Sequence, residues 1–188
     1  MTDQDGDVAL WVFGYGSLMW HPGFTPVDRQ LATLTGWHRS FCMWSIHHRG
    51  TEEDPGLVLA LDAQPGARCA GVAFGIGQEG ADETLAVLRE RELISSAYLE
   101  RRVTLSLRDG REVEALTYVV DPTHVQYCGG LPLERQAEVI AQAVGGRGPN
   151  DAYLYNTVEH LHELALPDPD LDWLADRVRR IKSDEAAP

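Results

Sequence analysis

The stretch VALWVFGYGSLMW, residues 8–20, runs from a dense apolar segment straight into a turn that contains two glycines. Residues 8–13 are rich in Val, Trp and Phe, which is typical of a strand covered on both faces. Gly14 and Gly16 end that strand, and backbone amides in such a turn can point into a common space that suits a carboxylate or an oxyanion. A turn that merely reverses the chain is the plainer interpretation, because a short glycine motif is weak on its own.

Two familiar motifs do not fit this turn. A dinucleotide-binding fingerprint needs a third glycine where the chain has Met19. A nucleophile elbow needs glycines where the chain has Tyr15 and Met19. Ser17 is therefore a poor candidate nucleophile.

Composition favours one cytoplasmic domain that acts on small molecules. The 188 residues are 44% hydrophobic, which is enough to bury one sizeable core. The formal net charge of -13, without a basic run, argues against a nucleic acid or a membrane surface as partner. No stretch approaches the ~20 apolar residues of a membrane span, and the acidic start does not resemble a signal peptide. Cys42, Cys69 and Cys128 are odd in number and widely spaced, which favours a reducing compartment.

Periodicity and turn residues predict an α+β chain whose C-terminal third is helical. Asp109-Gly110 is the strongest hairpin signal and predicts two strands within residues 101–120. One domain is expected over 8–183, with a loose N-terminus at 1–7 and a flexible tail at 184–188. Further strands are expected at 8–13, 36–45, 57–62 and 69–76, and helices at 81–93, 132–144, 149–164 and 167–183.

The helix expected at 81–93 carries a candidate acid–base residue. Leu85, Leu88 and Glu92 are spaced to share one helix face, whereas Glu90 projects to nearly the opposite side. A carboxylate on an apolar stripe either ends the helix near solvent, or is partly desolvated with a raised pKa that suits a general acid or base. The pattern leaves both placements open.

Arg39 would share a strand face with Phe41 and Met43 and so lie among apolar neighbours. An arginine there usually needs an anionic partner, either an acid of the protein, which is slightly favoured, or a substrate carboxylate. Neither the histidines nor the cysteines have metal-ligand spacing, so no metal site is expected. Cys128, in the loop YCGG, has no neighbouring base and is not a candidate nucleophile.

Several segments, in this order, resemble the ChaC family of γ-glutamylcyclotransferases, and specifically its bacterial type. The resemblance implies a small mixed β-barrel or sheet with flanking helices. It also implies cleavage of glutathione to 5-oxoproline and cysteinylglycine without a cofactor. The segments are FGYGSLMWHPGF at 13–24, GWHRSFCMWS with HRG at 36–50, PGLVLALD at 55–62, RERELISSAY at 89–98 and YCGG through HLHEL at 127–164.

The resemblance also implies the catalytic and substrate-binding residues. The family's catalytic glutamate follows an arginine and precedes a tyrosine, which points to Arg91-Glu92 with Tyr98. Arg89-Glu90 could be aligned instead, and the helix-face argument favours Glu92. Ser40 stands where many relatives carry a second arginine after the one matched by Arg39. The substrate-binding residues implied are Tyr15, Gly16, Ser17, Leu18, Arg39, Tyr98 and Tyr153, with Tyr155 as an alternative to Tyr153.

The implied reaction explains why no protein nucleophile is found. The α-amine of the γ-glutamyl unit can close a five-membered ring on its own γ-carbonyl, with Glu92 as both base and acid. A monomer or weak dimer is expected. Two alternatives remain open at this point: a cyclotransferase for other γ-glutamyl amino acids or γ-glutamylamines, and a non-catalytic regulatory or binding member of the fold.

Overall fold

The computed structural model describes residues 8–186, which form two compact units. The first unit holds residues 8–39 and 61–124, and the second holds residues 40–60 and 125–186. Each unit is therefore built from two separate stretches of the chain. The single domain expected over 8–183 stays a prediction, and the loose segment expected at 1–7 lies outside the described residues.

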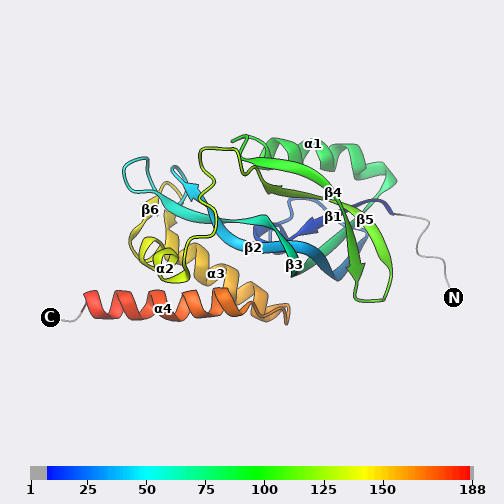
Figure 1. The fold of residues 1–188 in the computed structure, drawn as a ribbon. Helices are drawn as coiled ribbons and strands as arrows, with labels where there is room; N and C mark the ends of the chain where they lie inside the picture. The colour runs from blue at the N-terminus through cyan, green and yellow to red at the C-terminus, as the bar shows by residue number, and fades with distance from the viewer. Residues whose placement is uncertain (1–7, 187–188) are drawn as a thin grey trace. The chain divides into compact units, whose positions relative to one another are not determined.

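Five strands close a barrel in the order β1-β3-β2-β4-β5. In β1, Val12 lies opposite Phe74 of the antiparallel β3 and opposite Leu116 of the parallel β5. The expected α+β class, with a small barrel and flanking helices, is confirmed (Figure 1). The strands are β1 (Val8–Gly14), β2 (Asp28–Ser45), β3 (Gly56–Gly77), β4 (Tyr98–Leu107) and β5 (Glu112–Val120).

The barrel core of the first unit follows the two-residue period of its strands. Trp11, Phe13 and Tyr15 alternate along one side of the chain and belong to one buried cluster. Val12, between them, is also fully buried, as expected for a strand covered on both faces. The other members of the cluster are Ala32, Leu34, Leu61, Cys69, Ala73, Leu105, Leu107, Ala115 and Val119.

Two strands are longer than the sequence predicts. β2 begins at Asp28 rather than at residue 36, and β3 is continuous where two short strands were expected. Gly36 and Gly66 have φ values of 88° and 80°, so the breaks that they signal are local irregularities inside paired strands. The added part of β2 pairs with β4, for example Ala32 with Leu107. Pairing within the barrel therefore overrides the local turn signal.

The predicted hairpin between β4 and β5 is confirmed. Gly110 has a φ of 94°, a conformation that glycine adopts without steric cost. The Gly110 amide donates to the Leu107 carbonyl at 3.0 Å, and the Asp109 carboxylate accepts from the Arg111 amide at 3.0 Å. This turn fixes the register of the strand that carries Tyr118.

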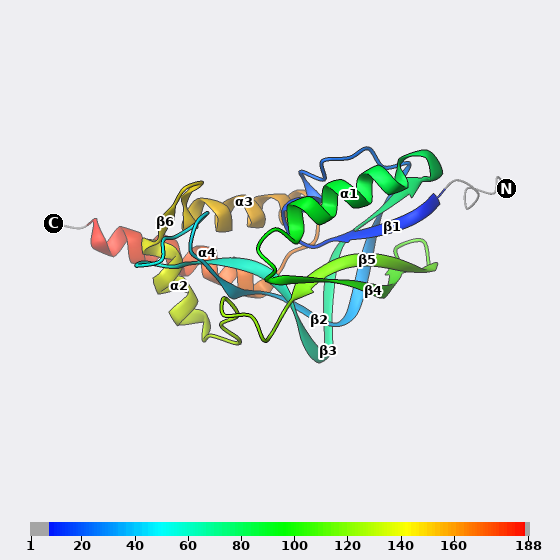
Figure 2. The same cartoon turned by 90° about the horizontal axis from the view of Figure 1, so that it is seen from above.

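Helix α1 (Ala81–Glu92) lies alongside β1 in both ribbon views (Figures 1 and 2). Its first turn holds Asp82 and Glu83, and its last turn holds Arg89 and Arg91, the order that the helix dipole favours. Thr84 and Leu88 are its buried residues, and Glu92 continues their line at the same four-residue spacing. The helix therefore ends with Glu92 on its inward face.

The second unit is mainly helical, with α2 (Leu133–Gln142), α3 (Asn150–Glu163) and α4 (Pro169–Glu185). A two-residue pair, β6 (Val144–Gly145) and β7 (Gly148–Pro149), separates α2 from α3. All three helices occur where the sequence predicts them, with ends shifted by no more than about two residues. Residues 184 and 185 were expected to belong to a flexible tail, but they are the last two residues of α4.

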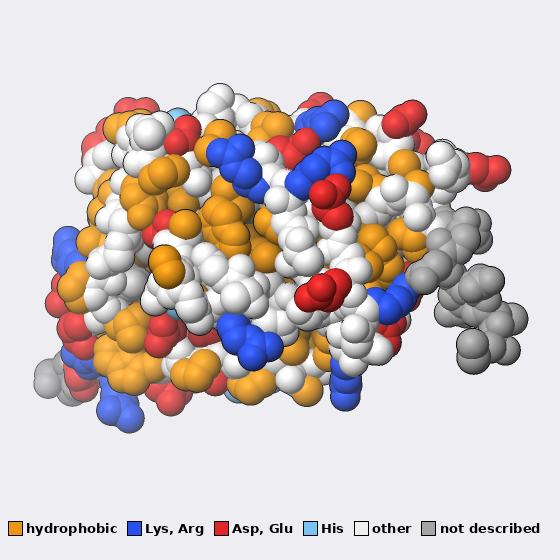
Figure 3. Space-filling view, turned by 45° about the vertical axis from the view of Figure 1, so that its right-hand side comes forward, with side chains coloured by type: hydrophobic (Ala, Val, Ile, Leu, Met, Phe, Trp, Pro, Cys, Tyr) orange, Lys and Arg blue, Asp and Glu red, His pale blue; other side chains and the backbone are white. Residues whose placement is uncertain are grey.

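Charged side chains of both signs are interspersed on the face shown in Figure 3. Arg102 and Glu114 form an ion pair in which both side chains are more than 60% exposed. Among the described helices, none is both long and apolar enough to cross a membrane.

Candidate active site

The glycine turn after β1 continues into one turn of 3-10 helix, η1 (Ser17–Met19). The Met19 amide donates to the Gly16 carbonyl at 2.9 Å, and the His21 amide donates to the Ser17 carbonyl at 2.8 Å. Within residues 8–186, the amides of Gly16, Ser17 and Leu18 donate to no other backbone group. The turn therefore holds three successive amides that have no main-chain acceptor among the described residues, which a donor role requires.

Tyr15 fixes the start of this turn to the barrel. Its ring belongs to the buried core, and its hydroxyl donates to the Tyr118 carbonyl at 2.9 Å. Its own carbonyl accepts from Arg39 Nη1 at 3.0 Å. The predicted substrate-binding residue Tyr15 is thus also a structural anchor of the turn.

Arg39 is buried, as its strand position predicts, with 4% of its surface exposed. The sequence left open whether a protein acid or a substrate carboxylate would be its partner. Two acceptors in the structure are main-chain carbonyls, those of Tyr15 and Ala70, both at 3.0 Å from Nη1. These bonds place the Arg39 charge directly against the residue that opens the glycine turn.

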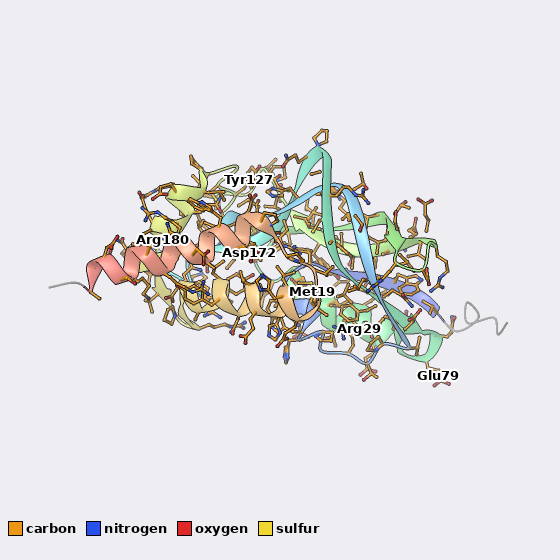
Figure 4. All side chains as sticks on the ribbon, turned by 90° about the horizontal axis from the view of Figure 1, so that it is seen from below. Met19, Arg29, Glu79, Tyr127, Asp172 and Arg180 are labelled. Carbon is orange, nitrogen blue, oxygen red and sulfur yellow. The ribbon has the colours of Figure 1, made fainter. Side chains whose placement is uncertain are left out.

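The far end of the turn has a second arginine anchor. Arg29 Nη2 donates to the Met19 carbonyl at 3.4 Å, and its guanidinium lies 5.9 Å from the centre of the Phe74 ring. Figure 4 shows Arg29 and Met19 in the same part of the first unit. The turn is therefore held at both ends, which keeps its amides in fixed directions.

The sequence left two placements open for Glu92, one near solvent and one partly desolvated. The structure shows the partly desolvated one. The Glu92 side chain is 19% exposed at the end of α1, whereas Glu90 is an exposed residue. Burial raises the pKa of the Glu92 carboxyl, and the neighbouring Arg91 charge partly opposes that rise. A carboxyl with a raised pKa is better suited to hold and release a proton than an ordinary exposed glutamate.

Arg91 joins Glu92 to the glycine turn. Its Nε lies 3.2 Å from Glu92 Oε1, and its Nη2 donates to Ser17 Oγ at 2.9 Å. Its Nη1 donates to the His21 carbonyl at 2.7 Å. Of the two ways to align the RERE segment, Arg91-Glu92 is therefore the pair at the turn.

Arg89 has a different partner. It forms two hydrogen bonds to the Glu100 carboxylate, at 2.9 and 2.8 Å. This pairing is the main cause that lowers the pKa of Glu100, and burial partly opposes it. The two arginines of RERE thus serve separate clusters.

Tyr118 of β5 is a site residue that the sequence did not reveal. Its hydroxyl donates to Glu100 Oε2 at 3.2 Å, and its residue surface is 1% exposed. Burial, the Glu100 carboxylate and, more weakly, the Glu92 carboxylate all raise the pKa of Tyr118. Its charge interaction with Glu92 therefore places a neutral, buried phenol near the candidate base. The contact between Tyr118 and Tyr15 spans 103 positions, so local patterns carry no signal for it.

The remaining predicted tyrosines have distinct surroundings. Tyr98 begins β4, is half-buried and pairs with Val120. In the second unit, the Tyr153 ring packs edge-on against Phe41 at 6.0 Å and lies 5.4 Å from the Arg49 guanidinium. Tyr155 instead lies 4.9 Å from the Arg179 guanidinium of α4.

In the first unit, Arg39 therefore contacts Tyr15 at the start of the turn, and Arg91 joins Glu92 to Ser17. Gly16 and Leu18 belong to the same turn. Tyr153 belongs to the second unit. No group of three or more His, Cys, Asp or Glu side chains in the described part of the chain could hold a metal ion.

This barrel, with a glycine turn and a partly buried carboxylate, has the fold of the γ-glutamylcyclotransferases. A yeast γ-glutamyl cyclotransferase specific to glutathione superposes with a TM-score of 0.82 over 93% of this chain and 97% of its own. A second solved γ-glutamyl cyclotransferase gives a TM-score of 0.52 over 88% of this chain and 85% of its own. Their sequence identities are 24% and 16%, so these likenesses concern the fold.

The chain belongs to the family of ChaC-like proteins, whose sequence profile matches residues 10–181. It is 38% identical to the glutathione-specific γ-glutamylcyclotransferase of Escherichia coli, over 92% of this chain and 74% of that protein. It is 36% identical to γ-glutamylcyclotransferase 2-3 of Arabidopsis thaliana, over 94% of this chain and 92% of that protein. The resemblance noted from the motifs is confirmed.

Proposed function

We propose that this protein is a glutathione-specific γ-glutamylcyclotransferase that converts glutathione to 5-oxoproline and cysteinylglycine. The observation that carries the proposal is the partly buried Glu92, joined through Arg91 to a turn with three backbone donors. The relatives from Escherichia coli and zebrafish, 38% and 34% identical, carry the name of this activity.

Ring closure needs a base. The α-amine of glutathione is mainly an ammonium at neutral pH, so it first loses one proton to solvent, and the neutral amine then attacks the γ-carbonyl. Glu92 takes a proton from the amine as its nitrogen forms a bond to the γ-carbon, and the carbonyl becomes a tetrahedral oxyanion. General base catalysis of this kind contributes typically ~10²–10⁴-fold.

Bond cleavage needs an acid, and the same carboxyl supplies it. When the oxyanion collapses, the bond between the γ-carbon and the cysteinyl nitrogen breaks, and protonated Glu92 gives its proton to that nitrogen. The raised pKa of Glu92 suits both steps, since the group must hold a proton briefly and then release it. No cofactor is required, because nucleophile and electrophile belong to one substrate.

The glycine turn provides the donors for the glutamyl end of the substrate. Amides of Gly16, Ser17 and Leu18 would hold either the α-carboxylate or the oxyanion. Both arginine anchors keep these amides in place without reorganisation during the reaction. The Ser17 hydroxyl already accepts a hydrogen bond from Arg91, which agrees with a nucleophile supplied by the substrate.

Other predicted residues would bind the substrate. Arg39 and Tyr15 support the turn, and the Arg39 guanidinium adds positive charge close to it, which offsets the net charge of -13 against an anionic substrate. Tyr98 is proposed to contact the bent glutathione chain. Holding that flexible chain in an attack conformer supplies much of the advantage of an intramolecular reaction.

The cellular setting is proposed as the cytoplasm. Cys42, Cys69 and Cys128 are all thiols, and none forms a disulfide. The thiols of Cys42 and Cys128 point at the main-chain carbonyls of Ala60 and Phe41, at 4.0 and 3.9 Å. Thiols in such positions persist in a reducing compartment.

The proposal is tested by following 5-oxoproline and cysteinylglycine together by mass spectrometry, with purified protein and millimolar glutathione. Both products should appear in equal amounts, and Glu92→Gln should lower kcat by ~10²–10⁴-fold. Glu90→Gln is the matched control, because Glu90 is exposed and lies two positions earlier on the same helix. Full activity in Glu92→Gln would refute the assignment of the base.

Specificity is tested in the same assay with γ-glutamylalanine. Turnover of glutathione with little turnover of γ-glutamylalanine supports the glutathione-specific function. Turnover of γ-glutamylalanine alone would establish the alternative cyclotransferase. Absence of turnover of both by folded protein would favour the non-catalytic binding function.

A further inference from the structure

We propose that Arg91 is a positioning residue that fixes the Glu92 carboxylate relative to the glycine turn. It does so by contacting Glu92 and by donating a hydrogen bond to the Ser17 hydroxyl. The expected effects on turnover rest on the proposed function, and the effects on the Glu92 carboxyl do not.

The guanidinium of Arg91 uses three nitrogens for three different partners. Nε faces Glu92 at 3.2 Å, Nη2 faces Ser17 Oγ at 2.9 Å, and Nη1 faces the His21 carbonyl at 2.7 Å. Because the guanidinium is planar and rigid, these contacts fix the Glu92 carboxylate relative to Ser17 and His21. One side chain thus sets the spacing between the candidate base and the donor turn.

The loop after the turn passes close to this side chain. Gly23 has a φ of 79°, and a Cβ placed there would lie 3.9 Å from Arg91 Nη1. The arginine side chain itself is 30% exposed, so neighbouring protein atoms cover most of it. The Arg91 side chain is therefore partly enclosed where it meets the turn.

The contrast with Arg89 gives the inference its specificity. Arg89 is also in the last turn of α1, yet its side chain is 52% exposed and pairs with Glu100. That pair supports the Tyr118 hydroxyl and not the turn. The two arginines differ in what they touch, although their sequence contexts are nearly identical.

The charged and titratable groups around Glu92 come from three elements. Arg91 of α1 is the neighbouring cation, and it opposes the rise in the Glu92 pKa that burial causes. Tyr118 of β5 is a neutral phenol that interacts electrostatically with Glu92, and it is hydrogen-bonded to Glu100 of β4, which in turn pairs with Arg89. Loss of Arg91 should therefore raise the Glu92 pKa further, since burial would act without opposition.

Two substitutions of Arg91 separate charge from geometry. Arg91→Met removes both, so kcat should fall by about 10²-fold, the size of effect that a ~1 Å misplacement produces. The acidic limb of its pH–rate profile should also move to higher pH. Arg91→Lys keeps the charge but not the rigid fork, so its acidic limb should stay near that of the unchanged protein while kcat still falls. Ser17→Ala removes one acceptor, and kcat should fall less than in Arg91→Met.

A measurement that needs no turnover tests the same contact. The protein is labelled with ¹³C at glutamate carboxyl carbons, and the Glu92 resonance is assigned as the one lost in Glu92→Gln. Its NMR titration midpoint should rise in Arg91→Met. Arg102→Met is the matched control, because it breaks an exposed arginine–glutamate pair of the same unit. In Arg102→Met, the titration midpoint of Glu92 and the kcat should equal those of the unchanged protein.

The outcomes distinguish the two proposals. If Arg91→Met keeps both kcat and the Glu92 midpoint of the unchanged protein, the positioning role is refuted. If Arg91→Lys restores kcat fully, Arg91 acts through charge alone and the geometric role is refuted. If the unchanged protein does not turn over glutathione, the proposed function fails, and a raised midpoint in Arg91→Met would still support the contact.

Discussion

At the scale of single residues, the site depends on a carboxylate that the fold holds partly out of water. Burial raises the pKa of Glu92, and the adjacent Arg91 limits that rise. Both groups lie at the end of α1, where the helix dipole favours a cation rather than an anion. Ionised Glu92 is therefore unfavourable for stability, and its placement is explained by the chemistry proposed for it.

This placement predicts how stability depends on pH. A carboxyl with a raised pKa contributes its full stability below its unfolded pKa, and this contribution is lost as the pH rises through the raised pKa of the folded state. Glu92→Gln cannot ionise, so its Tm should exceed that of the unchanged protein at neutral pH. The difference should shrink as the pH falls below the ordinary range for glutamate.

Thermal unfolding across a pH series measures this difference. Glu90→Gln serves as control, because Glu90 is exposed and should show no such pH-dependent gain. A constant Tm difference between Glu92→Gln and the unchanged protein at every pH would contradict a raised Glu92 pKa.

At the scale of elements, one buried amide ties α3 to β3 within the second unit. Asn150, the first residue of α3, is fully buried. Its Oδ1 accepts from the Leu57 amide at 2.7 Å, and its Nδ2 donates to the Leu57 carbonyl at 2.8 Å. The side chain thereby satisfies both main-chain groups of one residue near the start of a strand.

Asn150→Asp should destabilise the protein by about 1–3 kcal/mol, because an aspartate cannot donate to the Leu57 carbonyl and brings a buried charge. Urea denaturation measures the loss as a lower midpoint. Asn156→Asp is the matched control on the exposed side of the same helix, and it should change stability little. Equal stability of the two variants would contradict the importance of the Leu57 contacts.

The elements also show what the sequence could and could not predict. Helices were found to within a few residues because their periodicity and end signals are local, as at Asp168, whose side chain accepts from the Leu171 amide. The full length of β2 and β3 was missed because these strands continue through Gly36 and Gly66, where the sequence signals breaks. In the site, the helix face of Glu92 was predictable from spacing. The contact of Arg91 with Ser17 spans 74 positions, so local spacing could not predict it.

At the scale of the whole molecule, the net charge is the dominant electrostatic feature. The chain carries a formal charge of -13 and a sequence pI near 4.8. Exposed ion pairs such as Arg135 with Glu138 stabilise the fold only weakly, since pairs of this kind contribute about 0–1 kcal/mol each. They therefore do little to counter the repulsion among the excess negative charges. Self-repulsion should therefore weaken the folded state at neutral pH and low salt.

Raising NaCl from about 0.02 M to about 0.3 M should raise the Tm at neutral pH, because it shortens the screening length to well below ~10 Å. Close to the sequence pI of about 4.8, the same addition should have little effect. Thermal unfolding at both pH values and both salt concentrations measures this. A Tm that falls with salt at neutral pH would show that attractive ion pairs dominate instead.

The interleaving of the two units along the chain has a consequence for biosynthesis. Residues 40–60 leave the ribosome well before residues 125–186, with which they form the second unit. They carry side chains that are buried in the finished protein, including Phe41, Met43, Leu57 and Leu59. Until residues 125–186 are synthesised, these groups lack the rest of their unit, and uncovered apolar side chains of this kind expose a nascent chain to aggregation and to chaperones.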